Sequence, residues 1–428
     1  MKQKKLLVLG GTSASVDVIK VAKAEGIYTI VTDNLEGGVA KPLADEIANV
    51  STADIEGLVK LVKEKQIDGV FCGPSEFNIL NAIRVAKEAD LPFYCNEEQW
   101  NMCADKESFK NMCRTYNVPC VPEYELDEET WDEDVKNIKF PVIVKPVDSC
   151  SSRGISVCYG AETLKEAYDY AMSFSSRKRV LIEKYINNNI ALAVRYLVYN
   201  GKVYLSLVND RYTVGTKSGV AMISGFAVYP SLRTDEYIRT IDENVKRMIE
   251  SIGVKNGSMF MQALIDPETN EIYFHEMGLR LSGGLTYKLT EPTTGINDMK
   301  MMIRYMVGEE FSSEEEIQKV DPYLGNHYTA SLCVPLKTGK IMRLEGIDEI
   351  KNDQRVSDFV QYYKAGDEVL ERMMGTLDQH FCRVKFVVDS YEALDEMVQW
   401  IQKTLIIRDE NDEDMIYMYF DTNRLKEK

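Results

Sequence analysis

Gln262, Glu276 and Arg280 have the residue types and spacing of a metal and phosphate site. Glu276 and Arg280 lie in the segment HEMGLRLSGG, which ends an apolar run, and Gln262 lies in the apolar run before it. Side chains on a strand alternate between its faces, so Glu276 and Arg280 share a face if the strand stays regular. A connection over residues 267–271 sets Gln262 directly opposite Glu276. Oxygen ligands on neighbouring strands suit Mg²⁺, and a nearby guanidinium can hold a reacting phosphate. On these residues alone, an ion pair between Glu276 and Arg280 is an equally good interpretation.

A second candidate, Lys145, ends the apolar run PVIVK and precedes a loop of small residues from Asp148 to Gly154. A lysine ammonium beside backbone N–H groups and hydroxyls can hold a polyphosphate. Taken alone, an exposed turn with a solvated lysine is the simpler interpretation.

Glu183 lies in the apolar run VLIEKYI. An ionised carboxylate is unfavourable in a buried apolar strand unless it is paired or exposed, so its presence there requires an explanation. One explanation is an edge strand whose Glu183 faces water. The other is an adenine slot, in which Ile186 packs on the base and backbone groups of Glu183, Lys184 and Ile186 bind its hydrogen-bonding edge.

Three kinds of unit must position these residues. Residues 4–74 alternate apolar strand patterns with amphipathic helices, which predicts an open parallel α/β unit. Gly10, Gly11 and Asp33 fall where a dinucleotide site could form. The segment GGTSAS lacks the glycine spacing of such sites, however, and a tight strand-to-helix turn is the preferred interpretation. Residues 141–284 are rich in β-branched and aromatic strands, and residues after 330 combine short strands with one amphipathic helix.

The composition excludes several classes of protein. A formal net charge of −17 opposes binding to nucleic acid or an anionic membrane. The first apolar run, LLVL, is too short for a signal peptide, and no stretch is long enough to span a bilayer. Nine cysteines without C-x-x-C spacing and three scattered histidines favour neither a disulfide framework nor a zinc site. We therefore expect a cytoplasmic protein with reduced thiols.

Taken in order along the chain, these motifs resemble the ATP-grasp superfamily. The set comprises Asp105-Lys106, Lys145 with its loop, Glu183 to Ile186, Gln262, Glu276 and Arg280. The resemblance implies a mixed α/β and α+β chain in three parts. These are a Rossmann-like pre-ATP-grasp domain over residues 1–100, an ATP-grasp domain over 101–330 and a small α+β domain over 331–428. Within the grasp, residues 101–140 form a linker and first lobe, 141–187 the nucleotide-binding lobe, and 188–330 the metal and substrate lobe.

The resemblance also implies roles for single residues. ATP would be bound by one set of residues, Mg²⁺ (or Mn²⁺) by Gln262 and Glu276, and the acyl-phosphate intermediate by Arg280. The ATP set comprises Lys106, Lys145, Ser149, Ser151, Ser152, Gly154, Glu183, Lys184, Tyr185, Ile186 and Asn189. Two positions depart from the pattern: Gly278 replaces an asparagine ligand of many members, and Asn189 replaces the acidic residue that often binds ribose.

The segment RLSGG looks most like amino-acid and dipeptide ligases, within an architecture similar to biotin carboxylases and carbamoyl-phosphate synthetases. The resemblance therefore implies an ATP-dependent carboxylate–amine ligase for small-molecule acids and amines. Two alternatives stay open: an enzyme that phosphorylates bicarbonate or formate, and a nucleotide-binding protein without turnover. Similar enzymes are commonly dimers, so a homodimer is one option. Substrate-side candidates are Arg195, Arg211, Lys217, Gly283 and Gly284, although each cation alone fits a solvated surface position.

Overall fold

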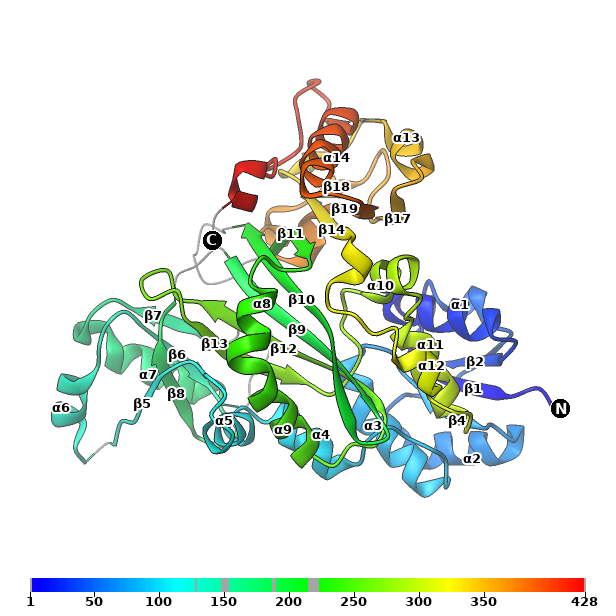
Figure 1. Cartoon of the computed structure of the whole chain (residues 1–428), viewed down its shortest axis with the longest axis horizontal. Coiled ribbons are helices and arrows are strands. Elements are labelled where there is room, and N and C mark those ends of the chain that lie inside the picture. Colours follow the sequence, from blue (N-terminus) through cyan, green and yellow to red (C-terminus); the bar gives the residue numbers. More distant parts are fainter. Residues whose placement is uncertain (1, 128, 148–153, 187–189, 215–222, 427–428) are drawn as a thin grey trace.

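The computed structural model describes residues 2–127, 129–147, 154–186, 190–214 and 223–426. The chain begins with a parallel α/β unit, as predicted (Figure 1). Its strands pair in the order β3-β2-β1-β4, and all neighbours are parallel. A parallel sheet covered by helices must be apolar on both faces, which explains the run KLLVL in its central strand. The elements are β1 (Lys5–Leu9), α1 (Val16–Ala24), β2 (Tyr28–Thr32), β3 (Glu46–Ala48), α2 (Ile55–Lys65), β4 (Gly69–Phe71) and α3 (Glu76–Glu88).

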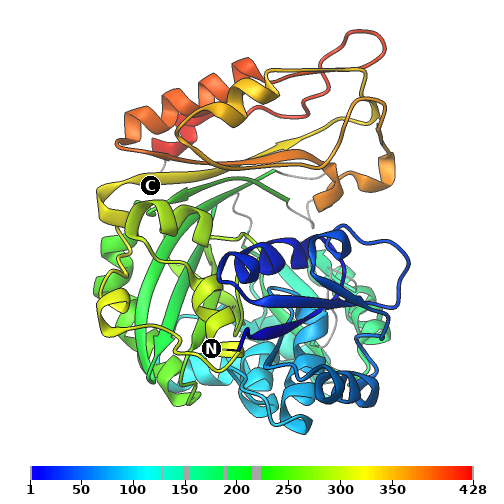
Figure 2. The same cartoon turned by 90° about the vertical axis from the view of Figure 1, so that its right-hand side faces the viewer.

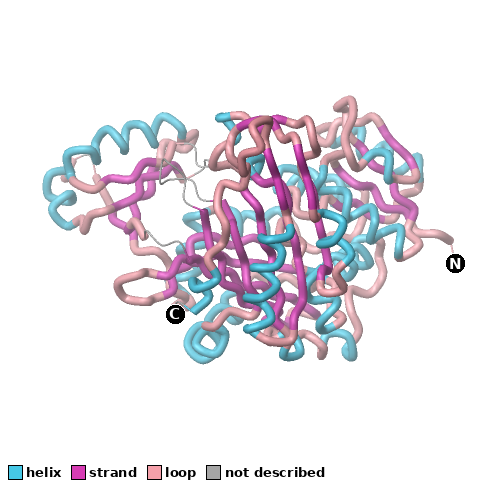
Figure 3. Tube along the Cα trace, turned by 90° about the horizontal axis from the view of Figure 1, so that it is seen from above, coloured by secondary structure: helices cyan, strands magenta, loops and turns pink. Residues whose placement is uncertain are grey.

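Two helices then lead into a small antiparallel lobe. Asp105 ends α4 (Glu97–Ala104) and caps α5 (Lys106–Thr115) by accepting a hydrogen bond from the Ser108 N–H at 2.9 Å. The lobe has the strand order β5-β8-β6-β7 and a separate hydrophobic core. It stands apart from the central sheet at the left of Figure 3. Its elements are β5 (Glu123–Tyr124), α6 (Trp131–Asp134), β6 (Val142–Pro146), β7 (Ser156–Cys158), α7 (Leu164–Phe174) and β8 (Val180–Lys184).

An eight-stranded antiparallel sheet forms the centre of the molecule. Its order is β13-β12-β9-β10-β11-β14-β19-β17, so strands from the predicted C-terminal domain continue the sheet of the grasp. The predicted division at residue 330 falls inside β14, which pairs with β11. The strands are β9 (Ile190–Tyr199), β10 (Lys202–Val214), β11 (Ile223–Tyr229), β12 (Gly257–Ile265), β13 (Ile272–Gly278), β14 (Tyr328–Pro335), β17 (Val356–Gln361) and β19 (His380–Val388).

Helices cover this sheet from several directions. Helix α14 (Tyr391–Thr404) packs on β14 and β19, at the top of Figure 2. Helices α10 (Tyr287–Thr294) and α11 (Asp298–Met306) lie between the central strands and the N-terminal unit (Figure 1). The remaining elements are α8 (Thr234–Tyr237), α9 (Glu243–Ser251), α12 (Glu314–Ile317), α13 (Ile347–Asn352), β15 (Gly339–Lys340), β16 (Arg343–Glu345), β18 (Glu368–Val369) and β20 (Ile406–Arg408).

One hydrophobic core joins the N-terminal unit to the central sheet. It includes Leu7 of β1, Met259 of β12 and Met302 of α11, all fully buried. The N-terminal unit and the part of the central sheet that carries Gln262 and Glu276 therefore share one core, whereas the small lobe has its own. No helix within the described ranges is long and apolar enough to cross a membrane.

Candidate active site

The hairpin β12–β13 places Gln262 directly opposite Glu276, as predicted. The route to this register differs from the prediction. Ile265 pairs with Ile272, so the connection runs from Asp266 to Glu271 and is longer than expected. The register then shifts beside Gln262, where Phe274 pairs with Ala263 and His275 is left as a bulge. The longer turn alone would shift the register by one residue, and the bulge at His275 returns Gln262 to the position opposite Glu276.

The bulge also brings His275 into the site, which the sequence analysis did not foresee. A regular strand would direct His275 and Glu276 to opposite faces. Burial, followed by the positive charge of Lys145, lowers the pKa of His275 to about 3. His275 is therefore a neutral imidazole beside the predicted phosphate-binding lysines.

The surroundings of Glu276 and Gln262 fit a divalent cation. Burial raises the pKa of Glu276 even though the charge of Arg280 opposes this. Among the described residues, no cationic side chain forms an ion pair with Glu276. The Gln262 Oε1 accepts a hydrogen bond from the Arg211 Nη1 and keeps a second lone pair. One carboxylate and one amide oxygen suit Mg²⁺, which commonly completes its coordination with phosphates and water.

Arg280 lies beyond β13, which ends at Gly278, so the condition that the strand stays regular to Arg280 is not met. Its guanidinium lies over the Phe260 ring at 4.7 Å from the centroid. It donates to the Leu281 carbonyl at 3.0 Å and pairs with Glu76 at 3.5 Å. The ion pair of Arg280 is therefore made with Glu76, not with Glu276.

The ring of Phe260 gives a physical reason for Gly278. Phe260 pairs with Gly278 across the hairpin, and a Cβ atom at Gly278 would lie 2.3 Å from the ring. Any larger residue at 278 would force the ring to move. Phe260 is a second contributor to the site that the sequence analysis missed.

Glu183 is almost completely buried, with 2% of its surface exposed, and lies between two lysines. It pairs with Lys145 at 2.5 Å and also with Lys110. Burial favours the neutral acid, but the charges of Lys145 and Lys110 outweigh it and lower the pKa of Glu183. Strand β8 lies between β5 and β6, so the edge-strand interpretation of Glu183 is wrong, and so is a solvated Lys145. Nothing in the spacing had pointed to Lys110.

Lys106 comes near Lys145 from the other side. It is the first residue of α5, and its Nζ lies 3.5 Å from the carbonyl oxygen of Pro146. The charges of Lys106 and Lys145 both act on His275. The helix cap and the end of β6 therefore bring the two predicted phosphate ligands together.

The predicted adenine stretch is only partly available to a base. The N–H groups of Lys184 and Tyr185 donate to the carbonyls of Pro122 and Pro141, at 2.9 and 3.0 Å. The Lys184 side chain pairs with the buried Asp266. The Lys184 N–H is therefore already used within the protein, and adenine binding by the backbone of Glu183, Lys184 and Ile186 stays a prediction. Ile186 is 6% exposed, and its packing on adenine stays a prediction.

Several predicted ligands lie outside the described residues, namely Ser149, Ser151, Ser152, Asn189 and Lys217. Gly154, at the end of the predicted phosphate loop, has φ +75°, and a Cβ atom there would lie 2.8 Å from Phe174. The positive φ and the close approach of Phe174 explain why a glycine occupies position 154.

On the substrate side, Arg195 and Arg211 are not solvated surface cations. Arg195 is 9% exposed and donates to the Asn209 Oδ1 at 2.6 Å and the Ser282 Oγ at 3.1 Å. A Cβ atom at Gly283 would meet nothing within 4 Å, and one at Gly284 would lie 3.3 Å from the Ser282 Oγ. Gly283 therefore borders open space, as a substrate-facing position requires.

The glycine turn after β1 is explained locally. The Gly11 N–H donates to the Asp33 Oδ2 at 2.9 Å, so Asp33 ties the turn to the end of β2. This bond supports the tight-turn interpretation over a nicotinamide site.

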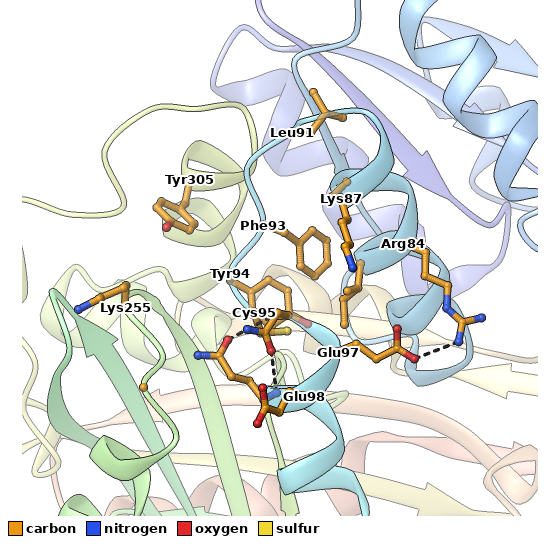
Figure 4. Close-up of a pocket in the computed structure, with 15 residues that line it drawn as sticks. Arg84, Lys87, Leu91, Phe93, Tyr94, Cys95, Glu97, Glu98, Lys255 and Tyr305 are labelled. Carbon is orange, nitrogen blue, oxygen red and sulfur yellow. Dashed lines mark hydrogen bonds and ion pairs between the residues drawn. The ribbon is translucent and has the colours of Figure 1, made fainter.

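One surface cavity lies away from these residues. It has a volume of about 650 Å³ and is bordered by α3, the start of α4, Lys255 and Tyr305 (Figure 4). An Arg84–Glu97 ion pair of 3.0 Å lies at its rim. Burial raises the pKa of the Cys95 thiol, so this cysteine is a poor nucleophile.

Residues 105–314 match the family described as the carbamoyl-phosphate synthase L chain, ATP binding domain. The small subunit of 2-oxoglutarate carboxylase from Hydrogenobacter thermophilus is 26% identical over 340 residues, covering 74% of this chain and 69% of that subunit. The formate-dependent phosphoribosylglycinamide formyltransferase of Bacillus velezensis is 27% identical over 187 residues. That match covers 43% of this chain and 48% of the formyltransferase, so the chain spans about half the length of that relative.

Two solved structures share the fold over almost the whole chain. The L-amino acid ligase from Bacillus licheniformis aligns with a TM-score of 0.77 and 17% identity, covering 96% of this chain and 100% of that one. The biotin carboxylase domain dimer of the Hydrogenobacter thermophilus 2-oxoglutarate carboxylase was solved with MgADP, ADP and bicarbonate. It aligns with a TM-score of 0.74 and 22% identity, covering 94% of this chain and 90% of that one. Residues 105–314 therefore belong to this family of ATP-binding domains, which have the ATP-grasp fold, and the proteins that the chain resembles are ATP-dependent ligases and carboxylases.

Proposed function

We propose that this protein activates a small carboxylic acid, an amino acid or a similar compound, as an acyl phosphate and joins it to an amine. One observation carries the proposal. Gln262 and Glu276 are paired across a hairpin, and the charges of Arg280, Arg211 and Lys106 all act on Glu276. Two oxygen ligands for a metal ion, with several cations beside them, suit a reaction that transfers a phosphoryl group.

In this proposal Lys106 and Lys145 bind the ATP phosphates, and Ile186 packs on adenine. Gln262 and Glu276 hold Mg²⁺, or Mn²⁺ as the alternative ion. When bound, the metal neutralises phosphate charge and orients the reacting oxygens. Glu183 lies deeper and holds Lys145 in place through their 2.5 Å ion pair. The other predicted ATP ligands, Ser149, Ser151, Ser152, Gly154, Tyr185 and Asn189, retain their proposed roles.

The chemistry has two balanced steps. A carboxylate oxygen of the acid attacks the γ-phosphorus of ATP, and ADP leaves. The amine nitrogen then attacks the acyl carbon, loses a proton, and phosphate leaves with the oxygen that the acid supplied. We assign Arg280 to charge on the acyl phosphate, because its guanidinium is fixed by Phe260, Leu281 and Glu76.

The relatives favour a second candidate, the activation of bicarbonate or formate. They include a 2-oxoglutarate carboxylase subunit and a formate-dependent formyltransferase. Bicarbonate and formate are small monoanions, so the same arrangement of metal ligands and Arg280 would support their phosphorylation.

A substrate matrix distinguishes the candidates. Mg²⁺-dependent phosphate release from ATP is measured across amino acids, small acids, bicarbonate and formate, each with and without amines, and Lys106→Ala is the blank. Release that needs one acid together with one amine supports the ligase. Release with bicarbonate or formate alone supports the second candidate. ATP binding without release across the whole matrix would contradict both.

We also propose a homodimer, since one solved structure with this fold is described as a dimer. Light scattering on the purified chain tests it, and a monomer at micromolar concentration would contradict it.

A further inference from the structure

Arg195 is a buried cation without a carboxylate partner. Its two hydrogen bonds go to a neutral amide, Asn209, and a neutral hydroxyl, Ser282. Its Nε atom is buried and has no hydrogen-bond partner among the residues that the structure describes. Among the described residues, no acidic side chain lies within ion-pair distance of Arg195. Burying a charge is unfavourable unless an opposite charge is close.

The other buried cations of the described chain do have such partners. Lys110 pairs with Glu123 at 2.8 Å and also with Glu183. Lys385, which is fully buried, lies 3.7 Å from Asp358. Arg195 is therefore the exception among the three cationic side chains buried in the described ranges, Lys110, Arg195 and Lys385.

Arg211 strengthens the charge imbalance. It lies on the neighbouring strand β10, and its hydrogen-bond acceptor, Gln262, is also neutral. Its Nε is another buried nitrogen without a partner.

Asp298 does not compensate for these charges. Its carboxylate accepts a hydrogen bond from Ser258 at 3.1 Å. Burial raises the pKa of Asp298 although the charge of Arg195 opposes this. Burial thus opposes the ionised form of Asp298, and among the described residues its carboxylate makes no ion pair with Arg195 or Arg211. An anion from outside the protein would balance the two arginines.

The position of Arg195 separates it from the phosphate-binding residues. It pairs in register with Phe260, which in turn pairs with Gly278, so two strand spacings, roughly 10 Å, separate it from β13. Its partner Ser282 lies in the chain between Arg280 and Gly283, and a Cβ atom at Gly283 would meet nothing within 4 Å. An anion at Arg195 would therefore lie near the reacting group without occupying the position of the γ-phosphate.

We propose that Arg195 and Arg211, with Asn209 and Ser282, form a subsite for a carboxylate that does not react. This inference rests on the proposed ligase function. The carboxylate belongs either to an acid substrate with two carboxylates or to an amine substrate that is itself an amino acid. In both cases the substrates carry one more anionic group than the reaction consumes.

Matched probes distinguish the two sources. The acid arm compares succinate with butyrate and glutamate with glutamine. The amine arm compares alanine with alaninamide, using the acid identified by phosphate release. Arg195→Met removes the charge and keeps the length, Arg195→Lys keeps the charge, and the exposed Arg239→Met is the control. We expect Arg195→Met to raise the KM of the carboxylate-bearing member of one arm roughly ten- to hundredfold. The KM of its neutral analogue should not change. Arg195→Lys should restore part of the lost affinity.

A second readout needs no turnover. Thermal midpoints with MgADP are measured with and without succinate, glutamate or alanine for the wild type and the variants. The proposal predicts a rise with one of these anions that Arg195→Met loses and Arg239→Met keeps. If no substrate pair releases phosphate but this rise occurs, the ligase assignment fails and the anion subsite stands. Equal effects of Arg195→Met on charged and neutral analogues, together with no Arg195-dependent rise, would overturn the subsite.

Discussion

At the scale of single residues, Gly278 decides how the metal site can be built. In the ATP-grasp pattern that the sequence resembles, many members have an asparagine metal ligand at this position. Here the ring of Phe260 fills the space, since a Cβ atom at Gly278 would lie 2.3 Å from it. The same ring carries the Arg280 guanidinium. One aromatic side chain therefore excludes a further ligand and positions the proposed catalytic arginine.

We predict that Phe260→Leu lowers kcat about tenfold and leaves the KM for ATP unchanged, because the variant loses the cation–π contact that holds Arg280. Steady-state kinetics tests this. Phe311→Leu is the matched control, since Phe311 is 2% exposed and packs on Tyr305 away from the site. If both variants had the same kcat as the wild type, Phe260 would not position Arg280.

We predict that Glu276→Gln raises the Mg²⁺ concentration needed for half-maximal ADP binding. In the wild type, protons compete with the metal for Glu276. Because burial raises its pKa, Mg²⁺ affinity should decline as pH falls towards a value above the ordinary glutamate range. The Gln variant should lack this pH dependence. Calorimetric titration at several pH values measures both effects, and identical curves would exclude Glu276 as a ligand.

At the scale of elements, the β12–β13 hairpin shows what the sequence can and cannot predict. The alternation of side chains gave the correct pairing of Gln262 with Glu276. It did not give the longer turn or the bulge at His275, because both depend on how the turn closes through Asp266 and Asn270. The burial of Glu183 between two lysines could not be predicted either, since Lys110 reaches Glu183 of β8 from helix α5, which is distant in the sequence. Local patterns predicted strands and pairs, whereas contacts between distant segments set the side-chain environments.

The bulge has a measurable consequence for stability. His275 has a pKa of about 3 in the folded chain and an ordinary value of 6.5. Between these values the unfolded chain binds more protons, so the free energy of unfolding falls as pH drops from about 6.5 towards 3. We predict a shallower fall for His275→Asn in urea unfolding at several pH values. An unchanged slope would show that His275 is not held neutral.

At the scale of the whole molecule, the N-terminal unit, the grasp and the C-terminal segment meet in a charge cluster. Lys288 of α10 pairs with Asp17 of α1 at 3.0 Å and with Asp358 of β17 at 2.7 Å. Lys385 of β19 donates to the Leu285 carbonyl at 2.9 Å, close to Asp358. Together with the continuous central sheet, this cluster makes the C-terminal segment part of one structure and fixes the loop that follows Arg280.

This cluster predicts how stability depends on pH. Burial, followed by the charge of Arg383, lowers the pKa of Lys385 to about 7 from the ordinary 10.5, while Asp358 and Asp17 oppose the shift. Between about 7 and 10.5 the unfolded chain binds more protons, so stability rises with pH in this window. The rise is on the order of a few kcal/mol. We predict that Lys385→Met removes this rise in urea unfolding, and the same slope in both proteins would contradict the assignment.

The central claim is that a carboxylate oxygen of the substrate attacks the γ-phosphate of ATP in the site formed by Gln262, Glu276 and Arg280. The most direct test uses the acid identified by phosphate release, labelled with ¹⁸O in its carboxylate. The released phosphate is analysed by mass spectrometry in the presence of ATP, Mg²⁺ and the amine. We predict that one labelled oxygen appears in each phosphate and that Arg280→Ala slows its formation by roughly 10²- to 10³-fold. Unlabelled phosphate released alongside the joined product would contradict the acyl-phosphate mechanism.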